Sequence, residues 1–197
     1  KTGQPLWSPV FKWDGSTSIF SMAYSVPILY QNRPVAVIGV DQRLDQISSF
    51  LQQLEISPGG ETFVLERNGL LVASSSQEKP YRLVDGKEQR LPAIASQNSL
   101  IRQTAQALLQ KLPSFKQIQE SEQFEFWVDG ERQIVRARPW GKSQGLDWIV
   151  VVAVPEADFT AQINAATYRT LLLCGLAFTV AILFGMVTAR WISQPIQ

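Results

Sequence analysis

The stretch Leu146–Phe159, with the sequence LDWIVVVAVPEADF, decides the fold of this chain. Its part Asp147–Val154 is apolar and rich in β-branched residues, which predicts a strand. Pro155 and Glu156 follow at once, and a proline near the first helical turn with acidic residues beside it is typical of the start of a helix. The sequence therefore predicts a strand that continues directly into a helix.

The predicted helix continues into a long apolar segment. Leu171–Ala189 is nineteen residues without Asp, Glu, Lys or Arg, and as a helix it would be about 30 Å long, which matches the hydrocarbon core of a bilayer. Arg169 and Arg190 flank it, as cationic residues do at membrane interfaces. We therefore expect one helix over residues 156–190 with a membrane span at about 170–189. A helix in the core of a soluble protein is the alternative.

The composition excludes several classes of protein. The formal net charge is +1, so no basic field attracts nucleic acid, and nucleic acid is not an expected partner. There is no histidine, which rules out a Ser-His-Asp triad, a Cys-His pair and a His-ligated zinc site. The single cysteine, Cys174, lies inside the apolar segment, where a thiol is inert as a catalytic nucleophile. The sequence predicts no catalytic residue, no metal site, no cofactor and no enzymatic activity for this chain.

The residues before the strand at 147–154 are mixed α and β by pattern. Two hairpins are indicated by turn residues that accept a positive φ, Asn68-Gly69 in one and Asp129-Gly130 in the other. Apolar residues recur at helical spacing over Ile101–Leu112, and the polar stretch 75–91 indicates a loop. We expect five antiparallel strands with a helix and a long loop on one face, an α+β, PAS-like unit. The strands are expected at residues 61–66, 70–74, 122–128, 131–138 and 147–154.

The first part of the chain has a shorter pattern of the same kind. Ile19–Ser25 and Pro34–Val40 are apolar, β-compatible runs, and the turn-like stretch Tyr30–Arg33 lies between them. Apolar residues then recur at helical spacing over Leu44–Leu54, and Pro58–Gly60 ends that helix. We therefore expect part of a second, similar unit, with two strands and a closing helix.

Five stretches carry a resemblance to a known family. Phe20–Tyr30 and Val35–Leu44 resemble the strand-turn-strand-helix close of the membrane-distal half of a double Cache (dCache) sensor domain. Gly59–Gly69 resembles the opening of its membrane-proximal half, and Leu146–Phe159 resembles the end of that half. Trp191–Ile196 resembles the first residues of a HAMP linker. The order of the stretches, with an apolar segment between the last two, is similar to the close of a sensor domain, a transmembrane helix and the start of HAMP.

The resemblance implies a domain organisation and an orientation. Residues 1–57 would be the C-terminal part of the membrane-distal Cache subdomain, and residues 58–155 the membrane-proximal, PAS-like subdomain. The helix at 156–190 would cross a bacterial plasma (inner) membrane, and residues 191–197 would start the HAMP linker. Residues 1–167 would then be extracytoplasmic and the C-terminus cytoplasmic. A first transmembrane helix and a long helix would come earlier in a longer polypeptide.

The implied function is ligand sensing outside the membrane and signal transduction across it. The resemblance favours a sensor histidine kinase of a two-component system as the longer protein; a chemoreceptor or a nucleotide or diguanylate cyclase receptor with the same input module is the alternative. The expected partners are a small-molecule ligand (an amino acid, an amine or a carboxylate), the lipid bilayer and a second copy of the chain. An alternative of another class is a membrane-anchored extracytoplasmic enzyme. It would have to use carboxylates such as Asp45, Glu55, Glu61 and Glu66.

Asp41 is the first candidate ligand residue. In amine- and amino-acid-binding members of the family an Asp at the end of a Gly-Val-Asp strand holds the ammonium group of the ligand, and the resemblance places Asp41 at that position. An ionised carboxylate in a partly dry pocket pairs well with a small cation. Helix capping is the alternative, because Asp41 lies just before the predicted helix and Asp is a favoured N-cap residue.

Other side chains are candidates for a pocket or for signal transmission. Arg132, Arg136 and Arg138 share one face of a predicted strand, which favours either an anion site or a solvated face. Aromatic residues in the first part of the chain favour either an aromatic ligand pocket or core packing; these residues are Trp7, Trp13, Tyr24 and Tyr30. Core and hairpin packing is expected of Phe124, Phe126 and Trp127. Signal transmission is expected of Pro155, Glu156 and Pro195.

Overall fold

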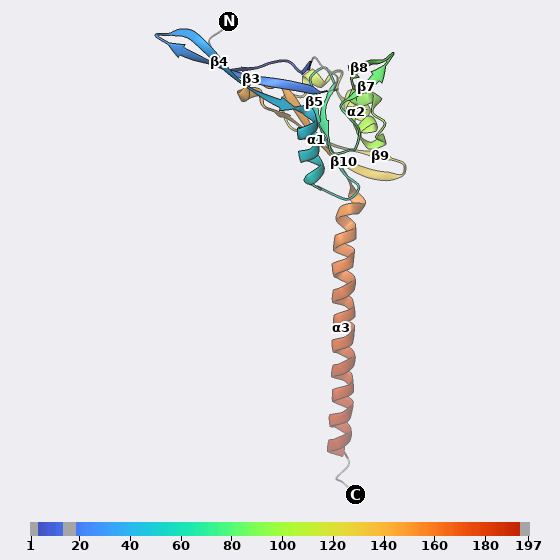
Figure 1. The fold of residues 1–197 in the computed structure, drawn as a ribbon. Helices are drawn as coiled ribbons and strands as arrows, with labels where there is room; N and C mark the ends of the chain where they lie inside the picture. The colour runs from blue at the N-terminus through green and yellow to red at the C-terminus, as the bar shows by residue number, and fades with distance from the viewer. Residues whose placement is uncertain (1–3, 14–18, 194–197) are drawn as a thin grey trace. The chain divides into compact units, whose positions relative to one another are not determined.

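The computed structural model describes residues 4–13 and 19–193 of the 197-residue chain. Residues Lys1–Glu156 form one compact unit and Ala157–Gln197 form a second. The first unit is mixed α+β with antiparallel sheets, and the second is helical (Figure 1). The predicted α+β class is therefore confirmed.

The larger sheet of the first unit has five antiparallel strands in the order β6-β5-β11-β10-β9. The sequence predicted these five strands, and the last of them, β11, lies at the centre of the sheet. Its residues are all apolar, which suits a strand whose two faces are both largely covered. The strands are β5 (Glu61–Glu66), β6 (Leu71–Ser74), β9 (Glu122–Val128), β10 (Glu131–Trp140) and β11 (Trp148–Pro155).

Helix α2 (Ser99–Lys111) covers one face of this sheet. It begins at Asn98, whose side chain accepts a hydrogen bond of 3.0 Å from the backbone N–H of Ile101, as an N-cap residue does. Ile101 is fully buried against Phe63 and its neighbours in the core. Three short 3₁₀ helices lie in the connections that the structure describes. They are η1 (Ala93–Ala95), η2 (Phe115–Gln117) and η3 (Lys142–Gln144).

The opposite face of the larger sheet packs against the first part of the chain. Helix α1 (Leu44–Gln53) buries Leu44 and Leu51 in a second core, which also contains Val64 of β5 and Trp148 of β11. A smaller antiparallel sheet has the order β1-β3-β2, with β4 paired to β3. Its strands are β1 (Leu6–Trp7), β2 (Phe11–Lys12), β3 (Phe20–Tyr30) and β4 (Arg33–Arg43).

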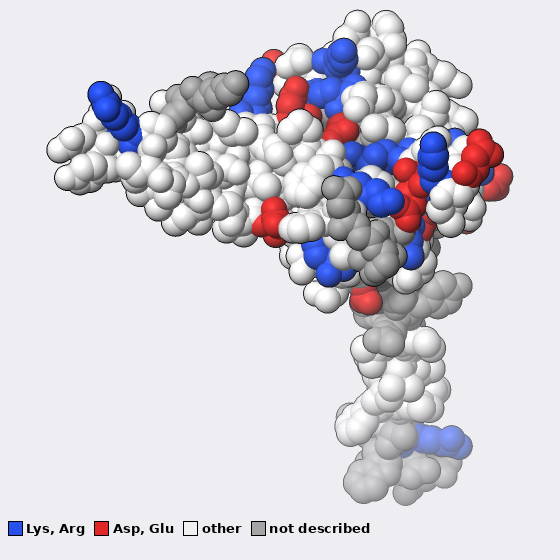
Figure 2. Space-filling view, turned by 45° about the horizontal axis from the view of Figure 1, so that its top comes forward, with Lys and Arg blue, Asp and Glu red and all other residues white. Residues whose placement is uncertain are grey.

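The hairpin of β3 and β4 is longer than predicted and extends away from the rest of the first unit (Figure 1). Residues 33–41 of β4 are all exposed, although Val35, Val37 and Ile38 are large and apolar. On the face that Figure 2 shows, this hairpin is almost free of charged residues, and Lys, Arg, Asp and Glu gather over the rest of the unit. Apolar residues on both faces of a strand are typical of a strand covered on both sides.

Two local predictions are wrong. Residues 75–91 are not a loop throughout, because β7 (Tyr81–Val84) pairs with β8 (Lys87–Arg90) in a hairpin. The turn Asp85-Gly86 has positive φ at both residues, which matches the right-handed twist of the strands. Trp127 does not pack in the core: it is 68% exposed, because it alternates to the outer face of β9, whereas Phe124 and Phe126 pack on the core as predicted.

The second unit is the long helix α3 (Glu156–Ser193), whose first residue belongs to the first unit. Within Thr170–Arg190 an 18-residue stretch has a mean hydropathy of 2.4, and α3 is the one described helix that is long and apolar enough to cross a membrane. Within it, the hydroxyl of Thr179 donates to the carbonyl of Gly175 at 2.6 Å. Such internal hydrogen bonds satisfy a hydroxyl group without water. The segment thus fits the predicted membrane span.

Candidate functional site

The structure brings two of the predicted aromatic residues together. Trp7 of β1 lies directly opposite Tyr24 of β3, and their ring centroids are 5.0 Å apart at an interplanar angle of 43°. Tyr24 in turn lies opposite Val40 of β4. Because directly opposite residues of an antiparallel pair point to the same face, these three side chains share one face of the smaller sheet.

Asp41 lies on the other face of that sheet. It is opposite Ala23, it is exposed, and its side chain makes no hydrogen bond or ion pair with another residue that the structure describes. The helix-cap alternative is wrong, because α1 begins at Leu44 and the N-cap position is taken by Arg43. Asp41 is still within β4, where the pairing with β3 continues to Arg43. Asp41 therefore does not share a pocket with Trp7 and Tyr24.

Tyr30 is separated from the other candidates. It lies at the tip of the β3–β4 hairpin and is 66% exposed. The turn beside it, Gln31-Asn32, has positive φ at both residues. Asp41, Tyr30 and the pair of Trp7 and Tyr24 thus occupy three different places. Alternation along the strands separates Asp41 from the pair, and the length of β3 separates Tyr30 from it.

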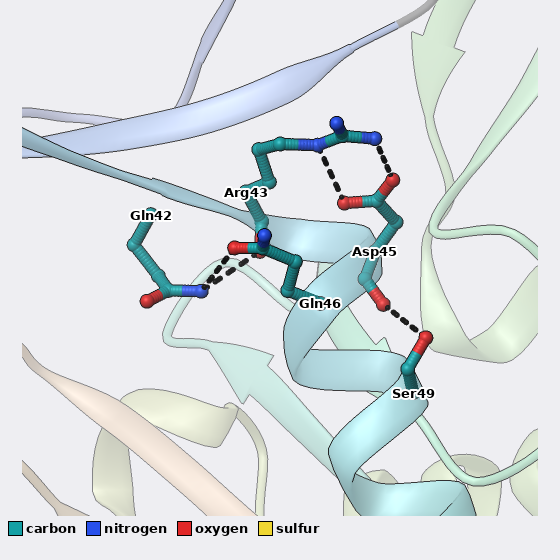
Figure 3. Close-up of polar contacts among 5 residues, drawn as sticks. All are labelled: Gln42, Arg43, Asp45, Gln46 and Ser49. Atoms are coloured by element: carbon teal, nitrogen blue, oxygen red, sulfur yellow. Dashed lines mark hydrogen bonds and ion pairs between the residues drawn. The ribbon is translucent and has the colours of Figure 1, made fainter.

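Polar contacts fix the junction between β4 and α1 (Figure 3). The guanidinium of Arg43 donates to both carboxylate oxygens of Asp45, with 3.0 Å from Nε to Oδ1. This hydrogen bonding raises the pKa of Arg43 above its usual value. The amide of Gln42 donates to Gln46 Oε1 at 3.2 Å, and the hydroxyl of Ser49 donates to the carbonyl of Asp45 at 3.0 Å. These contacts fix the positions of the residues at the start of α1.

A cavity of about 340 Å³ lies beside this junction. Phe20 and Tyr81 face each other in it with ring centroids 5.2 Å apart, and the ammonium of Lys79 lies 5.6 Å from the Tyr81 ring centroid. Sequence reasoning missed this cavity because Lys79 and Tyr81 come from the stretch predicted as a loop. Arg43 and Asp45, which pair with each other, also line it.

A second cleft of about 430 Å³ lies around Trp7. Its polar wall includes Arg67, a nearly buried side chain whose Nε donates to Asp147 at 2.9 Å and whose Nη1 donates to the carbonyls of Phe115 and Ile118. These contacts join the turn after β5 to η2 and to the residue before β11. Arg67 is therefore a structural residue, and no sequence signal indicated its role.

Two of the three predicted signal-transmitting residues lie where β11 ends. Pro155 is the last residue of β11 and Glu156 is the first of α3, so no loop separates the strand from the helix. Pro195 lies outside the described residues. The guanidinium of Arg132 on β10 donates to both carboxylate oxygens of Glu156, at 3.3 and 3.4 Å, and also to Glu125 on β9. The hydrogen bonds to Glu125 raise the pKa of Arg132.

Besides Asp45, two more of the carboxylates considered for catalysis have side-chain partners. Glu61 accepts from Asn98 at 2.7 Å and from Ser75, and Glu66 pairs with Arg90 at 3.4 Å. Burial lowers the pKa of Arg90. Among the residues that the structure describes, no three or more Asp, Glu, Cys or His side chains are grouped so that they could hold a metal ion.

Comparison with known proteins gives structural matches and no match to a family model. The extracellular domain of mmHK1S-Z3, described as a histidine kinase, matches with a TM-score of 0.49 and 16% identity, over 83% of this chain and 54% of that one. The ligand-binding domain of the Pseudomonas aeruginosa amino acid chemoreceptor PctB matches with a TM-score of 0.48 and 15% identity, over 85% of this chain and 56% of that one. Methyl-accepting chemotaxis protein X matches with a TM-score of 0.49 and 15% identity, over 79% of this chain and 52% of that one. The chain spans about half the length of these structures.

Proposed function

We propose that this chain is the extracytoplasmic ligand-sensing and signal-transducing part of a bacterial receptor in the plasma membrane. Residues 1–167 lie outside the membrane in this proposal, and the C-terminus lies in the cytoplasm. One observation carries the proposal: the central strand of an α+β sheet ends at Pro155, and a helix that contains a membrane-length apolar span begins at the next residue.

The direct connection gives a physical route for a signal. β11 is paired on both edges, with β5 and with β10, so a change in the sheet displaces β11 as a unit. Arg132 also binds Glu156 at the start of the helix. A displacement at this point enters α3 as a piston, tilt or rotation. A flexible linker at Pro155 would not transmit it.

The proposal extends to the domains and to the output. Residues 1–57 and 58–155 are the distal and proximal Cache subdomains in it, and residues 191–197 start a HAMP linker. We infer a sensor histidine kinase as the full-length protein; a chemoreceptor or a cyclase receptor would use the same input. The coding sequence after Gln197 distinguishes these outputs by the domain that it encodes.

Ligand binding is the direct test of the proposal. The full-length receptor in detergent is screened by thermal shift against amino acids, amines and carboxylates. At a free concentration of 100 times its Kd a ligand stabilises the folded state by about 2.7 kcal/mol, which raises the Tm of a domain of this size by about 5–10 °C. The absence of any shift across the screen would contradict the sensing role.

Asp41 is proposed to bind the ammonium group of the ligand. The variant Asp41→Asn removes the charge and is expected to abolish a shift caused by an amine or an amino acid, because the ion pair is lost. Asp85→Asn is the matched control: Asp85 is an exposed Asp of the same unit in a turn with a φ of 49°, which Asn also tolerates. An unchanged shift in Asp41→Asn would exclude the ammonium role.

We propose that the receptor is a parallel homodimer, and Cys174 offers a test. Cys174 lies within the apolar span and is exposed on α3. In membranes, oxidation with copper phenanthroline or treatment with a thiol cross-linker is expected to give a band of doubled mass. Cys174→Ser is the negative control, and Arg190→Cys in that background tests a second depth. Monomeric bands at both positions would argue against a dimer.

A further inference from the structure

An aromatic groove of about 350 Å³ lies on the first unit, where β1, α1 and the ends of β10 and β11 meet. None of the nine described residues that line it is charged. Aromatic walls with a few polar groups are the usual lining of small-molecule sites, and this volume lies in their range of about 300–1,000 Å³. The walls are made mainly by Trp7, Phe50, Trp140 and Trp148, and the carboxamides of Gln42 and Gln46 lie among them.

The aromatic walls of the groove are open to solvent. Trp140 is 50% exposed and Phe50 is 59% exposed, whereas Trp148 is buried beneath them. Trp140 stacks on Trp148 with ring centroids 5.9 Å apart and an interplanar angle of 25°. The stacked partner fixes the position of Trp140, so its exposed surface is a preformed platform for a flat ligand.

Trp140 also forms a wall of an adjoining hollow of about 800 Å³. This hollow is lined by Arg67, Arg138 and Lys142, and none of its nine described lining residues is a carboxylate. Arg67 is engaged with Asp147. The side chains of Arg138 and Lys142 make no hydrogen bond or ion pair with any residue in the described part of the chain, so their charges are available to an anion.

Strand register places Arg138 beside the aromatic platform. Trp140 lies opposite Trp148, and Arg138 lies opposite Val150. Arg138 and Trp140 are two residues apart on β10, so their side chains share one face and their Cα atoms are about 7 Å apart. A free guanidinium therefore lies next to an exposed indole, at the boundary between the uncharged groove and the cationic hollow.

We propose that the groove and hollow together bind an aromatic monocarboxylate. The aromatic body of the ligand stacks in the groove against Trp140 and Phe50, and its carboxylate accepts paired hydrogen bonds from the guanidinium of Arg138. A free amino acid does not fit as well, because no carboxylate lines either hollow to receive its ammonium group. The site is separate from Asp41 and does not rest on the proposed sensing role.

Isothermal titration calorimetry on the full chain in detergent tests this site with three probes. The probe 3-phenylpropionate has the ring and the charge, 3-phenylpropanamide has the ring alone, and acetate has the charge alone. We expect 3-phenylpropionate to bind with a Kd of about 1 mM or lower. The amide is expected to bind about tenfold or more weakly, because it loses the charge-assisted hydrogen bonds. Acetate is expected to give no measurable binding.

Two exposed arginines of one strand face supply the variant and its control. Arg138→Gln is expected to reduce 3-phenylpropionate binding to the level of the amide. Arg136→Gln is expected to leave it unchanged, because Arg136 lines neither hollow and donates to Ser121. Trp140→Ala is expected to abolish binding of both aromatic probes, with circular dichroism to verify the fold. Equal binding of acid and amide, equal losses in the two arginine variants, or no binding of any probe would overturn the proposal.

Discussion

Replacing Phe63 by alanine is expected to lower the free energy of unfolding of the first unit by about 3–5 kcal/mol. Phe63 is 0% exposed and lies on β5, opposite Val151 of the central strand β11. Its ring fills the core between the larger sheet and α2. Removing the ring loses the free energy gained by transferring it from water into the core. It also leaves a cavity, which β5 cannot close because both of its edges are paired.

Urea denaturation followed by tryptophan fluorescence, with the chain in detergent, measures this change. Phe50→Ala is the matched control, because it removes the same side chain where it is 59% exposed. That control is expected to change the free energy of unfolding by no more than about 0.5 kcal/mol. Equal effects of the two substitutions would mean that Phe63 is not a core residue.

Replacing Gly141 by alanine is expected to cost about 2–4 kcal/mol. Gly141 has a φ of +81°, a conformation that an L-residue adopts only with strain. A Cβ at this position would lie 2.7 Å from Leu146 Cβ and 3.3 Å from the Leu146 carbonyl oxygen. Neither atom is at the end of a flexible side chain. The turn also brings Trp140 back onto Trp148, so the substitution is expected to weaken ligand binding in the aromatic groove.

Gly130→Ala separates the two causes of that destabilisation. Gly130 has nearly the same φ, +85°, but nothing lies within 4 Å of a Cβ built there. Its substitution is expected to cost only the backbone strain, about 1–2 kcal/mol. The difference between the two variants in urea denaturation then measures the collision with Leu146. If both variants unfold at the same urea concentration, the close approach at Gly141 has no energetic consequence.

Local signals in the sequence predicted most of the elements. The turns at Gly69 and Gly130 have the positive φ that glycine accepts, and the strands on each side of them pair as predicted. These predictions succeeded because a tight turn and a period of two residues are properties of neighbours in the chain. Asp85-Gly86 is a turn signal of the same kind, but the polar residues around it led to the prediction of a loop instead of a hairpin.

The side chains were harder to place than the elements. Asp41, Trp7 and Tyr24 were predicted as ligand residues of one region, but strand pairing puts Asp41 on the opposite face of the sheet from the other two. Core and hairpin packing was predicted for Trp127, which is 68% exposed and does not lie in the core. A shift of one position along a strand reverses the face, so a prediction needs the register as well as the strand.

The sequence by itself determined the α+β class, the apolar strand at 147–154, the direct passage from Pro155 into a helix and the apolar span within that helix. Each of these follows from residue type and spacing over a short stretch, because the spacing of apolar residues determines which face of a strand or helix is buried. Only the tertiary structure decided that Arg67 joins three segments and that Trp7, Phe50, Trp140 and Trp148 line one groove. Those residues are up to 141 positions apart, and strand register and helix packing, which depend on the whole fold, bring them together.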